Sequence, residues 1–245
     1  MLKIKDYNVI RFSSKNIVLN EGSEANITMD KRNFIVYKEW KTKMIGTIPN
    51  KVEKLNRLEE ISQLDDYMVK TYYLVKRNDQ IKGYVMPYEQ TEEDDFYNLS
   101  FQTKLNYLYA FKDTINFLKD VGVYYFDFSP KNIYVKNGKI KLYDKDNVQI
   151  GDLKSDLHGI FLKNYLEKGG KLDCHAMIYA YNCFVFSLLS KTFGYRLAKQ
   201  ELINHPNLYR SIIENKDIET FVHELLEDKI NGIIDHDYLV DRFKI

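Results

Sequence analysis

Two carboxylates and one carboxamide near the middle of the chain have the residue types and the spacing for metal-assisted chemistry. Asp127 precedes Asn132 by five positions, a proline lies between them, and Asp144 follows after two apolar runs. Between those runs, Asn137-Gly138 is a strong signal for a two-residue β-hairpin turn. Such a hairpin would bring Asn132 beside Asp144 at its open end, next to the loop that carries Asp127. Carboxylate and amide oxygens suit Mg²⁺, and Asp127 would be a candidate general base.

The elements that must hold these residues differ between the two halves of the chain. In the first half, short apolar runs predict strands over 16–20, 25–29, 34–38, 72–75 and 81–86, and amphipathic spacing predicts a helix over 50–64. The second half is mostly helical, with helices predicted over 100–120, capped by Ser100, and over 173–190, opened by Asp173. We therefore expect one α+β domain over 1–245, β-rich over about 1–89 and mostly helical over about 90–245.

A lysine ends the apolar face of one predicted strand. Because side chains alternate along a strand, Phe34, Val36 and Lys38 should share a face. A charge is unusual on a face that packs on a core, although a lysine can also reach solvent from a strand end. The arrangement is expected if the face lines a nucleotide cleft, with Val36 against the base and Lys38 at the phosphates.

These features resemble the catalytic centre of the protein-kinase superfamily, in which an Asp-x-x-x-x-Asn loop precedes a strand pair that ends in a metal-binding Asp. The resemblance implies that Asp127 accepts the proton of the substrate hydroxyl and that Asn132 holds one Mg²⁺. It further implies that Asp144 holds the metal bridging the terminal phosphates of ATP, and that Lys38 is the strand lysine that contacts those phosphates. The implied architecture is bilobal, with a small β-rich lobe and a larger helical lobe.

The resemblance also implies partners for Lys38 and for ATP. Kinases pair the strand lysine with a glutamate of the following helix, for which Glu53 is our choice, with Glu59 and Glu60 as alternatives. The segment that follows the strand predicted over 81–86, Met86-Pro87-Tyr88-Glu89, corresponds to the kinase hinge, whose backbone forms hydrogen bonds with adenine. The implied ATP-binding residues are Gly22, Ser23, Ile27, Val36, Lys38, Met86 and Tyr88.

The chain departs from the common kinase motifs at three points. Of the three glycines in the phosphate-covering loop, only Gly22 is present. Tyr125-Phe126-Asp127 stands where His-Arg-Asp is usual, and Asp144-Lys145-Asp146 replaces Asp-Phe-Gly. Ser129 in the loop from Asp127 to Asn132, where many protein kinases have lysine, and the Asp144-Lys145-Asp146 run resemble the atypical RIO-type kinases or small bacterial or phage-type members.

Composition restricts the partners. The net charge is +1 with both signs interspersed, so neither nucleic acid nor an acidic membrane is an expected partner. The N-terminus lacks the apolar core of a signal peptide. Cys174 and Cys183 lie nine positions apart on one predicted helix, about 13 Å along its axis, which is too far for a disulfide. A cytoplasmic location follows as an expectation.

The expected activity is transfer of the ATP γ-phosphoryl group, with Mg²⁺, to a hydroxyl of a protein serine or threonine. Two alternatives remain open: a pseudokinase that serves as a nucleotide-binding or scaffold protein, and a small-molecule phosphotransferase. The loss of glycines favours the pseudokinase, whereas the set Lys38, Asp127, Asn132 and Asp144 favours an enzyme.

Overall fold

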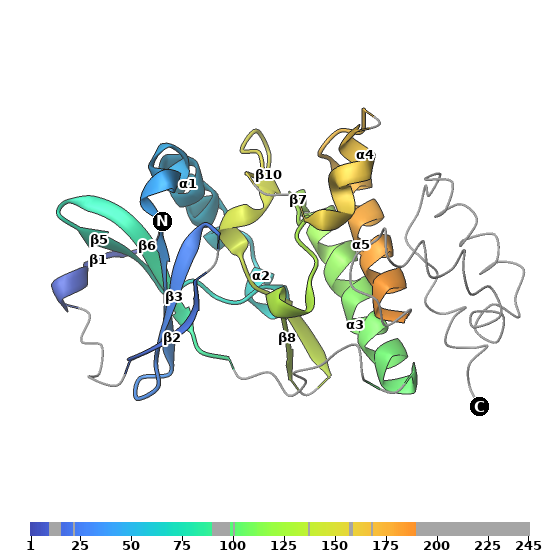
Figure 1. Cartoon of the computed structure of the whole chain (residues 1–245), viewed down its shortest axis with the longest axis horizontal. Coiled ribbons are helices and arrows are strands. Elements are labelled where there is room, and N and C mark those ends of the chain that lie inside the picture. The colour runs from blue at the N-terminus through green and yellow to red at the C-terminus, as the bar shows by residue number, and fades with distance from the viewer. Residues whose placement is uncertain are drawn as a thin grey trace, which may run out of the picture. The chain divides into compact units, whose positions relative to one another are not determined.

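The structure is a computed structural model that describes residues 1–9, 16–21, 23–89, 99, 101–136, 138–156, 159–167 and 169–189. It is an α+β structure that divides into two compact units (Figure 1). The first unit comprises Met1–Thr91 and Lys141–Asp156, and the second comprises Glu92–Ile140 and Leu157–Ile245. Residues 141–156 therefore belong with the β-rich N-terminal part, although they follow the first elements of the second unit in the sequence.

A six-stranded mixed sheet dominates the first unit, in the order β1-β5-β6-β4-β3-β2. β1 runs parallel to β5, and all other neighbours are antiparallel. The five predicted strands are confirmed, and one short strand was not predicted. The bounds are β1 (Ile4–Asp6), β2 (Asn16–Glu21), β3 (Ala25–Asp30), β4 (Ile35–Trp40), β5 (Tyr73–Arg77) and β6 (Gln80–Pro87).

The register of β4 determines what each face of this sheet carries. Lys38 is paired with Ile27 on β3 and with Tyr84 on β6, and Val36 is paired with Met86. Since paired residues point to the same side and alternate residues share a face, all five side chains lie on one face. The other face packs a separate small core, formed by Tyr37, Val75 and Val85.

Phe34 does not belong to the apolar face that the sequence predicts. It precedes β4 in a left-handed conformation with a φ of 51°, and its side chain is 66% exposed. The predicted face therefore begins at Val36, and Phe34 is a turn residue.

The helical part of the first unit begins where β4 ends. The 3-10 turn η2 (Thr42–Thr47) leads into α1 (Ile48–Glu59), which lies beside the sheet (Figure 1). The helix predicted over 50–64 ends early, at Glu59. Gln63 then adopts a left-handed conformation with a φ of 65°, and a new short helix α2 (Leu64–Tyr67) follows it. The remaining elements of this unit are η1 (Tyr7–Val9), η4 (Lys145–Asn147) and β10 (Gln149–Ile150).

The described part of the second unit is mostly helical. The predicted helices are confirmed as α3 (Phe101–Asp120) and α5 (Cys174–Leu189). Asp173 caps α5 as expected, because its Oδ1 accepts the Ala176 amide at 3.1 Å. The predicted cap Ser100 lies outside the described residues. Shorter elements are β7 (Val123–Tyr124), η3 (Pro130–Asn132), β8 (Ile133–Lys136), η5 (Ile160–Leu162) and α4 (Lys163–Glu167).

The predicted hairpin is also confirmed. β8 pairs with β9 (Lys139–Leu142), which begins in the second unit and continues into the first. Gly138 in the turn has a φ of 70°, a conformation that glycine adopts without steric cost.

Within the described ranges, no helix has both the length and the apolar character required to span a bilayer. Cys174 and Cys183 are both free thiols, as expected from their spacing.

Candidate active site

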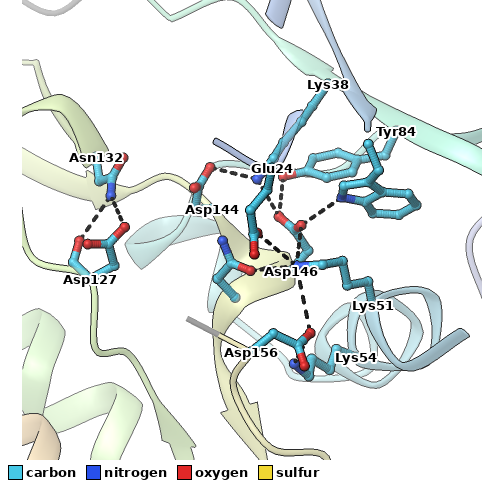
Figure 2. A network of polar contacts seen from close by, with 12 residues as sticks. Glu24, Lys38, Lys51, Lys54, Tyr84, Asp127, Asn132, Asp144, Asp146 and Asp156 are labelled. Carbon is cyan, nitrogen blue, oxygen red and sulfur yellow. Dashed lines mark hydrogen bonds and ion pairs between the residues drawn. The ribbon is translucent and has the colours of Figure 1, made fainter. Parts of the chain in front are cut away.

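The catalytic-loop candidates in the second unit are held together by hydrogen bonds. The Asn132 amide nitrogen donates to the Asp127 carboxylate oxygen Oδ2 at 2.9 Å and to the Asp127 carbonyl at 3.0 Å (Figure 2). The loop continues into η3 (Pro130–Asn132), where the backbone N–H of Asn132 donates to the Ser129 carbonyl at 3.0 Å. With its amide nitrogen turned toward Asp127, Asn132 has its amide oxygen as the atom that could hold a metal.

An aromatic core fixes the backbone on both sides of Asp127. Phe126 and Phe128 are buried, whereas Asp127 between them is partly exposed. The Phe128 ring contacts Tyr181 and Phe184 of α5, with centroids 5.7 and 6.2 Å apart. The aromatic neighbours of Asp127 therefore anchor the loop in the hydrophobic core, and this anchoring restricts the position of the carboxylate.

Gly159 is a close neighbour of Asp127 that the sequence analysis did not identify. Its amide donates to the Phe126 carbonyl at 3.2 Å. A Cβ at this position would lie 2.9 Å from that carbonyl oxygen and 3.0 Å from the Asp127 carboxylate. Only glycine leaves room for the loop in its present conformation.

In the first unit, Lys38 meets two carboxylates of the segment that follows β9. Its side chain is buried, and its Nζ lies 3.0 Å from Asp144 Oδ1 and 2.8 Å from Asp146 Oδ1 (Figure 2). Asp144 has a left-handed φ of 62° and begins η4, a turn that brings both acids to the same ammonium group. Burial alone would lower the pKa of Lys38, but Asp144 and Asp146 outweigh it and raise this pKa well above its ordinary value.

Asp146, rather than Asp144, is the centre of this network. Asp146 is fully buried and receives the Tyr84 hydroxyl at 2.9 Å and the Trp40 indole N–H at 2.8 Å. Burial would raise the pKa of Asp146, but the charges of Lys38 and Lys51, with their hydrogen bonds, hold it well below its usual value.

Helix α1 contributes lysines to this network. Lys51 Nζ donates to Asn147 Oδ1 at 2.6 Å and lies 3.3 Å from both Asp146 and Glu24. Glu24 lies in the predicted phosphate-covering turn, and its carboxylate forms an ion pair with Lys51. Lys54 lies 3.6 Å from Asp156, and burial, only partly offset by Asp156, lowers the pKa of Lys54.

The expected pair of Lys38 with a helix glutamate is not what the structure shows. Glu53 accepts a hydrogen bond from Arg57 at 3.0 Å on the exposed side of α1. Glu59 and Glu60 are exposed as well. The physical reason is that α1 turns Lys51 and Lys54 inward, so a carboxylate from η4 is the group that reaches Lys38.

Most of the predicted ATP-binding residues lie on or near the Lys38 face of the sheet. Val36 and Met86 are buried and Ile27 is half-buried on that face. The Tyr88 amide donates to the Phe34 carbonyl at 2.8 Å just beyond β6. Ser23 is exposed in the turn before β3, and Gly22 lies outside the described residues.

The residues predicted to hold Mg²⁺ are oxygen donors of suitable chemistry. Asp144 has a side chain 24% exposed, so its carboxylate is accessible from solvent, and Asn132 can offer an amide oxygen. Magnesium needs one or two such protein ligands when phosphates and water complete its shell. Among the described residues, no group of three or more His, Cys, Asp or Glu side chains could form a metal site alone. That Asp127, Asn132 and Asp144 meet at one point stays a prediction.

Comparison with protein-family models and with curated proteins finds no significant match to this chain. Its activity must therefore be inferred from its own residues.

The first testable prediction concerns Gly159. Gly159→Ala should lower the free energy of unfolding by about 1–3 kcal/mol, because the added methyl group overpacks against the Asp127 backbone. Gly46→Ala is the matched control, since nothing lies within 4 Å of its added Cβ. Denaturant unfolding of both variants measures the difference. Equal effects at the two positions would contradict the packing described here.

The second prediction concerns acid stability in metal-free buffer. Because the pKa of Asp146 is depressed in the folded state, its stabilising contribution is complete above its ordinary pKa of 3.8 and is lost as the pH falls below that value. Asp146→Asn should be less stable than the wild type by about 3–5 kcal/mol at neutral pH. The difference in free energy of unfolding between the two proteins should become smaller as the pH is lowered.

The control for the acid-stability prediction is Asp152→Asn, which removes an exposed partner of Arg57 and should leave only a small gap at any pH. Denaturant unfolding at several pH values measures both gaps. A gap for Asp146→Asn that stays constant into strong acid would show that its charge is not what stabilises the fold.

Proposed function

We propose that this chain is an ATP- and Mg²⁺-dependent phosphotransferase with a bilobal, protein-kinase-like fold, acting on serine or threonine hydroxyls of a protein. The observation that carries the proposal is the Asp127–Asn132 pair, joined within one loop at 2.9 Å and anchored by buried aromatic neighbours. The Lys38–Asp144 pair, at 3.0 Å on the β4 face, supports it independently. Each pair is assembled within its own unit.

The chemistry that we propose is a direct phosphoryl transfer. The acceptor hydroxyl oxygen bonds to the γ-phosphorus while the bond from that phosphorus to the β–γ bridging oxygen breaks, and ADP leaves with the electron pair. Asp127 takes the hydroxyl proton, and the Asn132 amide keeps the Asp127 carboxylate in one orientation. Lys38 presents a positive charge to the phosphates. One Mg²⁺ at Asn132 and another at Asp144 would neutralise the remaining phosphate charge.

Two observations favour a nucleotide-binding scaffold without turnover as the second candidate. Asn20 and Ala25 stand at two of the three glycine positions of a phosphate-covering loop, and the acidic residues Glu21 and Glu24 lie beside them. Lys38 is paired with two carboxylates of the protein itself. Such a scaffold would bind ATP and transfer nothing.

The third prediction tests nucleotide binding. ATP at about 1 mM should raise the melting temperature of the wild type, because a ligand that binds only the folded state stabilises it. Mg²⁺ should increase this shift, and Lys38→Met should reduce it. The measurement is a thermal melt with ATP, with ATP and Mg²⁺, and with Mg²⁺ alone. The absence of any shift with nucleotide would exclude both the enzyme and the nucleotide-binding scaffold.

The fourth prediction separates enzyme from scaffold. Asp127→Asn keeps size and polarity but removes the proton acceptor, so transfer should fall by roughly 10²–10⁴-fold while ATP binding survives. Asp120→Asn, at the exposed end of α3, is the matched control and should leave the rate unchanged. The assay is incorporation of γ-phosphate into the protein itself, into lysate proteins and into small alcohols.

The acceptor that is labelled in this assay distinguishes the candidates. Labelling of small alcohols alone would replace the protein-kinase assignment by a small-molecule phosphotransferase. A wild type that binds Mg-ATP and labels none of these acceptors would be a scaffold.

A further inference from the structure

Asp146 is not among the metal ligands or catalytic groups proposed above, yet its carboxylate is fully buried and receives four donors (Figure 2). Lys38 and Tyr84 donate to Oδ1 at 2.8 and 2.9 Å, and Trp40 and Lys51 donate to Oδ2 at 2.8 and 3.3 Å. A carboxylate has about four lone-pair sites. Asp146 is therefore fully occupied by protein donors and has no site left for a metal.

Asp144 differs from Asp146 in both burial and bonding. Its side chain is 24% exposed, and Lys38 reaches its Oδ1 at 3.0 Å. Lys38 is thus held twice, by one carboxylate that solvent can reach and by one that it cannot. A cation that binds Asp144 would compete with the Lys38 ammonium group for it, whereas the bond to Asp146 would remain.

We propose that Asp146 is the positioning residue for Lys38, holding its ammonium group at the phosphate site while Asp144 serves the metal. This inference rests on the proposed function and deepens it. In the kinase resemblance, a glutamate of the helix positions the strand lysine. In our proposal, Asp146 of η4 has this role. Helix α1 contributes through Lys51, which donates to the second oxygen of the same carboxylate and so fixes its orientation.

The test is a double-mutant cycle on ATP affinity in EDTA, where no metal can compensate for a misplaced lysine. Calorimetry gives the affinity of the wild type, Asp146→Asn, Lys38→Met and the double variant. Because hydrogen bonds to charged groups are strong, Asp146→Asn should weaken ATP binding by about tenfold. It should cause no further loss when Lys38 is already Met, since Asp146 acts through Lys38. Circular dichroism and a cooperative thermal melt check that each variant is folded, since the Trp40 indole itself donates to Asp146 and its emission would report that lost contact.

Two results of the cycle would overturn the proposal. Equal losses from Asp146→Asn in both backgrounds would mean that Asp146 only stabilises the fold. No loss of ATP affinity from Asp146→Asn in the otherwise wild-type protein, where Lys38 is present, would mean that the carboxylate does not position the lysine at all.

Asp144→Asn provides a second test that does not depend on the folding of Asp146→Asn. With Asp146 intact, ATP affinity in EDTA should stay within about twofold of the wild type, and only the gain from Mg²⁺ should disappear. A loss in EDTA as large as that of Lys38→Met would assign the positioning role to Asp144 and overturn the proposal.

Failure of the inference is distinguishable from failure of the proposed function. If the wild type binds no ATP, both the proposed function and the positioning role of Asp146 are excluded. A wild type that binds ATP and transfers phosphate, combined with additive losses in the cycle, removes only the role of Asp146.

Discussion

Burying the Asp146 carboxylate without partners would cost several kcal/mol, so its donors must be supplied from elsewhere in the first unit. β4 supplies Lys38 and Trp40, β6 supplies Tyr84, and α1 supplies Lys51. A shift of β4 by one residue against β6 would turn Lys38 and Trp40 to the opposite face of the sheet. The buried charge therefore selects one register of β4 against β6 and one position of α1 relative to the sheet. Lys38 is one of the donors that this choice fixes.

In the second unit, Asp127 is held in place by contacts of a different kind from those around Asp146. There the loop is fixed mainly by apolar contacts, because the residues on both sides of Asp127 are aromatic and buried. Gly159 lies against the loop backbone where any side chain would collide with it. A carboxylate that is held by packing retains its position when its own charge changes, and this would suit the general base of the proposed phosphotransferase. A lysine held by carboxylates keeps its charge, and this would suit the phosphate contact proposed for Lys38.

Local sequence patterns predicted the elements well and their long-range partners poorly. Alternation and turn residues were sufficient for the strands from β2 to β6 and for the hairpin at Gly138, because these signals arise within a few residues. The partners of Lys38 lie 106 and 108 positions away, and no local period encodes them. Lys51 and Lys54 were missed because helix lysines usually lie at the surface. The amphipathic spacing predicted a helix in this region, but it gave no indication that two of the helix lysines are buried. Gly159 has no distinguishing local signal, since its importance arises only from the proximity of Asp127.

The balance of charge around Lys38 indicates why Asp144 suits a cation while Asp146 does not. The ion pairs of this network join three ammonium groups, on Lys38, Lys51 and Lys54, to four carboxylates, on Glu24, Asp144, Asp146 and Asp156. One negative charge is formally left over. It cannot reside at Asp146, whose two oxygens are each matched by one lysine and one neutral donor. Asp144 shares Lys38 with this better-bonded neighbour and is accessible from solvent. If the proposed function holds, a divalent cation that arrives with phosphates would bind at Asp144 and leave Asp146, whose buried charge holds α1 in place, with all its donors.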